Sequence, residues 1–219
     1  MKYLMIENAA ILLCTGIGFI SGIRYLKNQK TLYASMIVMG VGCILLGRLY
    51  QCVRLWTGGT LTDDFQVGIL GTIGAFSFFF SSNYGQFDSL VDNGNKAFAK
   101  YRLISLIAPA LVAAAFVELL LSPASPAFKI SSGIAFTMIG AACYYHLKHF
   151  LIPDADFGIV RCLRRFNAAA LCLAVMSMLE LVALANDSEW LLIVAGIGLS
   201  ATTLLLVPIM DRGVKAWRA

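Results

Sequence analysis

The sequence predicts an all-α polytopic membrane protein: one domain over residues 1–219, folded as a seven-transmembrane-helix bundle. Three observations support this prediction. The 219-residue chain is 59% hydrophobic and only 13% charged, whereas soluble domains have about 45–50% apolar and about 25% charged residues. The apolar residues gather in long runs separated by short polar linkers. The basic residues are concentrated in alternate linkers, as membrane topology requires.

Seven apolar runs are long enough, or nearly long enough, to cross a bilayer, which takes about 20 residues of helix. The third run is the shortest. The runs cover residues 3–23, 32–56, 66–82, 103–121, 130–150, 166–185 and 190–210.

The linkers between the runs are short. Residues 57–60 and 122–126 are composed of Gly, Ser, Thr, Pro and Ala and predict turns, and residues 83–100 form the longest connection. Pro109 and Pro208 predict kinks in the fourth and seventh helices, because proline removes a helical hydrogen bond. Glycines within several runs predict close contacts between helices.

The basic residues predict the orientation of the bundle. Basic linkers stay on the cytoplasmic side of a membrane, and thirteen of the 17 lysines and arginines lie in alternate linkers and the C-terminal tail. The other side collects acids: Asp63, Asp64, Asp187 and Glu189. We therefore expect a multi-pass protein of the cell membrane, with its N-terminus outside and its C-terminus in the cytoplasm.

The net charge of +5 does not indicate nucleic-acid binding, because the basic residues lie between apolar runs and not in one soluble patch. The expected partners are the lipid bilayer, a small-molecule ligand, and a cytoplasmic or membrane protein that meets the basic inner face. The six cysteines have no CxxC or zinc-site spacing, so they are interpreted as packing residues.

Charged residues inside the apolar runs predict a polar site. A charge at membrane depth costs about 2.5–3.5 kcal/mol even on insertion scales, so it usually faces protein or water and has a partner. With the orientation above, these charges share the outer half of the membrane: Glu7, Arg48, Arg54, Glu118 and Glu180.

Arg48 is the deeper arginine and the predicted anchor of an outward-facing pocket, within reach of Glu180 or Glu118. Its forked donors grip carboxylate or phosphate, which predicts a small anionic or zwitterionic ligand. The predicted ligand-binding residues are Arg48, Gln51, Glu180, Glu118, Glu7 and Ser177. Arg54 is expected to reach the outer interface and stay hydrated. The alternative is a structural role, with ion pairs that fix packing or side chains that extend to the interface.

His146 and His149 lie three residues apart near the end of the fifth run, followed by Asp154 and Asp156. Such residues can hold a metal or perform acid–base chemistry. No HExxH or comparable signature surrounds them, so we expect interfacial histidines at the helix end, with a solvated turn. The sequence predicts no catalytic residue, no metal and no cofactor.

The seven-run plan with an external N-terminus resembles the rhodopsin-type topology in architecture alone. The last run has no lysine for a retinal Schiff base, so light sensing by that chemistry is excluded. The chain also lacks the Pro-Gln pair of PQ-loop sugar transporters, and six of its seven runs lack the histidines of ceramidase-type hydrolases. We therefore predict a ligand-binding or sensory, receptor-like protein. A small-molecule transporter or channel is the alternative, and an intramembrane enzyme is the second alternative.

Overall fold

The computed structural model describes residues 2–28, 31–84, 88, 92, 94, 96–153 and 159–218, and within these residues the secondary structure is helical, with no strand. Among these described residues, six helical stretches are long and apolar enough to cross a membrane, with η1, α5 and α6 counted as one stretch. The helical structure confirms the predicted all-helical fold. The apolar helices have the pattern of a multi-pass membrane protein. The helices are α1 (Lys2–Asn28), α2 (Leu32–Trp56), α3 (Ile69–Tyr84), η1 (Lys96–Phe98), α5 (Ala99–Ser105), α6 (Ile107–Leu121), α7 (Pro126–Leu151), α8 (Ile159–Ala185) and α9 (Glu189–Arg218).

The ends of α2 coincide with the predicted run 32–56 because the chain supplies signals at both ends. Thr31 is the N-cap, and its hydroxyl accepts a hydrogen bond from the Ala34 amide at 3.2 Å. After Trp56 the chain turns, and Gly58 takes a φ of 81°, a left-handed conformation that glycine adopts without strain.

Pro109 divides the fourth predicted run into two helices. A proline has no backbone N–H to donate to the carbonyl four residues earlier, here the carbonyl of Ser105. The proline ring also clashes with that carbonyl. The helix is accordingly interrupted at Leu106. The Leu106 amide donates to the carbonyl of Leu103, three residues earlier, at 3.1 Å, and not to the carbonyl four residues earlier as in an α-helix. Pro208, in contrast, lies inside α9 without ending it.

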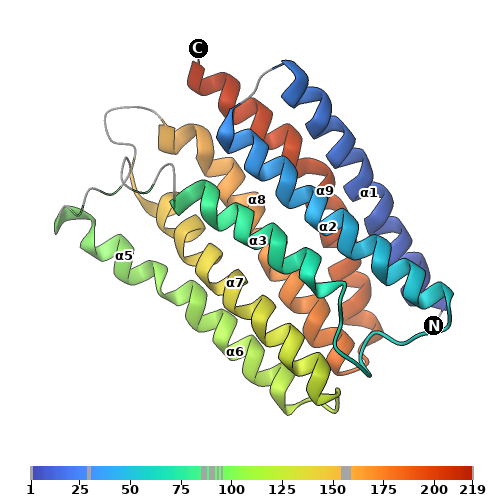
Figure 1. The fold of residues 1–219 in the computed structure, drawn as a ribbon. Coiled ribbons are helices and arrows are strands. Elements are labelled where there is room, and N and C mark those ends of the chain that lie inside the picture. Colours follow the sequence, from blue (N-terminus) through green and yellow to red (C-terminus); the bar gives the residue numbers. More distant parts are fainter. Residues whose placement is uncertain are drawn as a thin grey trace.

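Six helices form a closed ring, with α5 and α6 outside it. Each neighbouring pair is in contact: α1 with α2, α2 with α3, α3 with α7, α7 with α8, α8 with α9, and α9 with α1 (Figure 1). Both α5 and α6 pack against α7, and α6 also contacts α8. The chain termini lie at opposite ends of the bundle in Figure 1, and we call these the N-terminal end and the C-terminal end.

Glycines bring the backbones of α2 and α3 together. A Cβ atom on Gly71 would lie 2.7 Å from the Cα of Gly47 and would also meet the carbonyl oxygen of Cys43. Small residues permit such close approach between helices. At the seam between α1 and α9, a Cβ on Gly18 would lie 2.7 Å from the Thr203 carbonyl oxygen. The ring is therefore held by close backbone contacts on both sides of its interior.

The helix α3 has 16 residues and begins three residues later than its predicted run. Gln66 and Gly68, which precede it, are buried without being helical. Their backbone amides have hydrogen-bond partners: the Gln66 backbone amide donates to the Ser131 hydroxyl of α7 at 3.3 Å, and the Gly68 amide donates to Gln66 Oε1 at 3.2 Å. These bonds satisfy buried backbone groups that no helix satisfies.

Candidate functional site

Arg48 lies on the buried face of α2, together with Ile44, Gln51 and Leu55. The residue is only 4% exposed. A buried charge is costly unless it is paired and hydrogen-bonded. The surroundings of Arg48 must therefore supply a countercharge and acceptors.

Glu180 of α8 supplies that countercharge. The two terminal nitrogens of Arg48 each donate to one oxygen of the Glu180 carboxylate, the two-pronged pairing that is the strongest for arginine. Arg48 Nη1 also donates to Asn8 Oδ1 of α1 at 3.2 Å and to Gln51 Oε1 at 3.1 Å. All four residues are buried. We call Asn8, Arg48, Gln51 and Glu180 the Arg48 cluster.

The Arg48 cluster lies in the interior of the ring. Along the ring, α2 and α8 are separated by α3 and α7 on one side and by α1 and α9 on the other. The ion pair between Arg48 and Glu180 therefore connects opposite walls of the bundle, and Asn8 adds a third wall. An arginine that faced lipid could not make these contacts.

A pocket of about 200 Å³ opens at the N-terminal end of the bundle, above the Arg48 cluster. Its lining combines five leucines with polar loop residues, among them Thr60, Thr62 and Asp187. Three of the leucines, Leu4, Leu55 and Leu184, each lie four residues, about one helical turn, from a member of the Arg48 cluster and nearer the end of the bundle. These three residues, the leucine layer, separate the pocket from the cluster.

The other predicted site residues lie in different surroundings. Glu118 is exposed on α6, which lies outside the ring, so it does not join the Arg48 cluster. Ser177 is buried on α8. Glu7 is buried, but its side chain lies against α9 and not against Arg48. Arg54 pairs with Asp64 at 2.9 Å, and the Asp64 side chain is 74% exposed, so this arginine meets its partner near water.

The sequence pattern does not single out Asn8. Successive residues of a helix point about 100° apart, so Asn8 faces α2 while its neighbour Glu7 faces α9. An amide within an apolar run is the available signal, since burying it requires a hydrogen-bond partner.

A second buried polar cluster lies nearer the C-terminal end. His146 of α7 is fully buried and contacts Asn83 of α3 and Asn167 of α8. Its Nδ1 lies 2.6 Å from Asn83 Nδ2 and 2.9 Å from Asn167 Oδ1, and the two amides are bonded to each other at 3.0 Å. His146 is therefore covered by α3 and α8 and shielded from solvent.

His149 and Lys148 connect the end of α7 to Asp88 and Asp92, two described residues between α3 and α5. His149 Nε2 lies 3.0 Å from Asp88 Oδ1, and Lys148 pairs with Asp88 and, at 3.4 Å, with Asp92. Burial opposes the ionisation of Asp88, but the hydrogen bonds from His149 and Lys148 outweigh burial and hold the pKa of that carboxyl below its usual value. The contacts indicate a structural tether.

Asp154 and Asp156 lie outside the described residues. Within the described part of the chain, no three His, Cys, Asp or Glu residues are grouped so that they could hold a metal ion. The absence of a metal and of a catalytic role for the histidines stays a prediction.

Large apolar side chains fill the ring between the two polar clusters. Phe76, Phe79 and Leu173 are almost completely buried there. The two polar clusters therefore lie in separate layers, and the layer with a full ion pair lies beneath a pocket. No protein-family model, curated protein or solved structure matches this chain.

Proposed function

We propose that the protein is a seven-pass, receptor-like protein of the cell membrane that binds a small anionic or zwitterionic molecule in an outward-facing pocket. The N-terminus is outside and the C-terminus is cytoplasmic. The opposite positions of the two termini in Figure 1 support an odd number of passes. In this proposal α3 is the seventh crossing, and the buried residues Gln66 and Gly68 complete its path.

The distribution of basic residues supports the orientation. The C-terminal end of the bundle holds the basic residues at the end of α1, along η1 and α5, and at the end of α9, for example Arg24, Lys27, Lys100 and Lys215. Basic residues favour the cytoplasmic side. This end is also the surface at which a cytoplasmic or membrane protein partner would receive a signal.

The proposed topology predicts a specific labelling pattern. A cysteine in place of Asp63, which is exposed between α2 and α3, should react in whole cells with a membrane-impermeant maleimide. A cysteine in place of Lys96, exposed after α3, should react only after the membrane is permeabilised. The unmodified protein measures the background from its own cysteines. The reverse pattern would overturn the orientation, and labelling of both positions in whole cells would show that α3 does not cross.

The Arg48 cluster is the observation that supports ligand binding. It lies about one helical turn below the pocket, and the leucine layer between them must move aside for a ligand to reach it. An ion pair inside a membrane bundle is expensive and marks a functional site by default. It offers one positive and one negative group side by side. A zwitterion fits this arrangement best, because a ligand that engaged only Arg48 would leave Glu180 buried without a partner. The apolar residues between the two polar clusters favour binding over passage through the bundle.

A stabilisation screen tests the proposed ligand class. The purified protein is heated with the common amino acids, glycine betaine or short monocarboxylates, and we expect at least one of them to raise the unfolding temperature by a few degrees. Arg48→Lys keeps the charge but loses the forked donors, so it should lose this response. Arg54→Lys is the matched control and should retain it. A screen without any response, or an unchanged response in Arg48→Lys, would contradict the proposal.

A further inference from the structure

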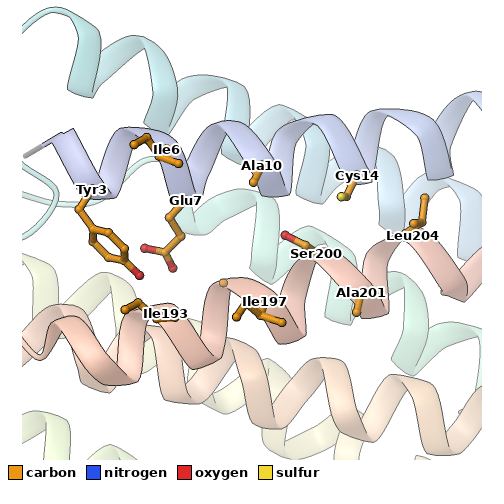
Figure 2. A pocket seen from close by; sticks show the side chains of 11 residues that line it. Tyr3, Ile6, Glu7, Ala10, Cys14, Ile193, Ile197, Ser200, Ala201 and Leu204 are labelled. Atoms are coloured by element: carbon orange, nitrogen blue, oxygen red, sulfur yellow. The ribbon is translucent and has the colours of Figure 1, made fainter.

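A groove of about 440 Å³ runs between α1 and α9 on the outer side of the ring (Figure 2). Small residues of both helices, among them Ala10, Cys14 and Ser200, line it and leave the space. Ile6 and Ile197 flank it and are 69% and 68% exposed. If the protein spans the membrane as proposed above, these exposed apolar residues face the hydrocarbon of the bilayer, and the groove opens sideways into the lipid.

Glu7 extends into this groove without a partner. The residue is 7% exposed, and neither oxygen of its carboxyl group has a hydrogen-bond partner among the described residues. Figure 2 shows the carboxyl group pointing from α1 toward α9. It lies against Gly196, where a Cβ atom would be 2.7 Å from Glu7 Cγ, so the glycine makes room for it.

Within the described part of the chain, no hydrogen bond joins Glu7 to a basic residue. Arg48 pairs with Glu180 through two hydrogen bonds and also donates to Asn8 and Gln51. A buried carboxyl group is stable when it holds a proton or when it has a positive partner. The groove therefore presents a buried acid that can form an ion pair with a cationic ligand.

The shape of the groove indicates what kind of cation fits. Glu7 lies near the N-terminal end of α1, and from there the groove continues past Ala10 to Cys14, a distance of about 10 Å at 1.5 Å per residue. A molecule with a charged head and one apolar chain matches this layout. Its head would lie at the end of the helix, where lipid headgroups lie, and its chain would run toward the middle of the membrane.

We infer that the groove between α1 and α9 binds the ammonium head of an amphiphile through an ion pair with Glu7, with the apolar chain along the helices. Two sources share this chemistry: a free single-chain amine and the headgroup of an aminophospholipid. The site is separate from the Arg48 cluster and does not depend on a ligand there.

Thermal unfolding in nanodiscs tests this inference. In discs of phosphatidylcholine and phosphatidylglycerol, dodecylamine should raise the unfolding temperature saturably, by a few degrees more than dodecanol, which has the same chain without the charge. Glu7→Gln keeps the shape of the side chain and should lose the excess caused by dodecylamine. Glu118→Gln removes an exposed carboxyl group outside the groove and should respond like the wild type.

Two further comparisons make the result decisive. Ala10→Trp fills the groove while retaining Glu7, and it should abolish the response to dodecylamine. Discs that contain phosphatidylethanolamine, without added amine, identify the source: stabilisation that depends on Glu7 in these discs indicates a membrane lipid, and its restriction to dodecylamine indicates a free amine. An equal response of Glu7→Gln and wild type in both kinds of disc, or equal stabilisation by dodecanol, would overturn the inference.

Discussion

Arg48→Ala should lower the free energy of unfolding by about 3–5 kcal/mol, because it leaves the Glu180 carboxylate buried without a countercharge. Asn8 and Gln51 lose their shared donor as well. Chemical or thermal unfolding of the purified protein in detergent measures the change. Arg54→Ala is the control: its partner is exposed, so the loss should be about 0–1 kcal/mol.

A double variant separates the effect of pairing from the effect of side-chain loss. Replacing both members, Arg48→Met with Glu180→Leu, removes the ion pair but fills the space with apolar atoms, and this exchange is often neutral or stabilising. We expect it to recover most of the stability lost in Arg48→Ala. If Arg48→Ala were as mild as Arg54→Ala, the pair would not be the buried contact described above.

Gly71→Ala should lower the free energy of unfolding by about 1–3 kcal/mol or more, as overpacking does in tight interiors. The added Cβ would meet the backbone of α2 at Gly47 and Cys43, and backbone cannot rotate aside as a side chain can. The two helices must separate instead. Unfolding in detergent, together with the yield of folded protein, measures this effect.

Gly16→Ala is the matched control for this variant. Gly16 is also a helical glycine, but a Cβ there would lie 3.7 Å from Leu45 Cδ1, an ordinary contact. Alanine favours a helix over glycine by about 1 kcal/mol, so this variant should be neutral or more stable. Equal losses in Gly16→Ala and Gly71→Ala would mean that the spacing of α2 and α3 is not set by their glycines.

The position of each charged residue along its helix could be predicted from the sequence. The neighbour that its side chain faces around the helix could not. Arg48 and Glu180 were expected at a similar depth, and the structure brings them into contact. Glu118 has a similar predicted depth, yet it is exposed because α6 packs outside the ring. Which helices form the ring depends on long-range contacts that periodicity within one helix does not contain.

Local signals predicted helix limits well where a cap or a proline was present. The run 32–56 matches α2, and the kink expected from Pro109 takes the form of an interrupted helix. The burial of His146 could not be predicted from such local signals. The residues that contact its side chain, Asn83 and Asn167, lie on two other helices, 63 and 21 residues away in the sequence.

The separation of Arg48 and Glu180 in the chain, 132 residues, bears on how the protein is made. Chains are synthesised from the N-terminus, and early segments begin to fold first, so α2 emerges from the ribosome long before α8. During this interval Arg48 has no carboxylate from α8, while an arginine within a membrane helix costs about 2.5–3.5 kcal/mol on insertion scales. The amides of Asn8 and Gln51 are already present, one on α1 and one on α2 itself. They can hold the guanidinium group in the nascent protein until Glu180 is translated.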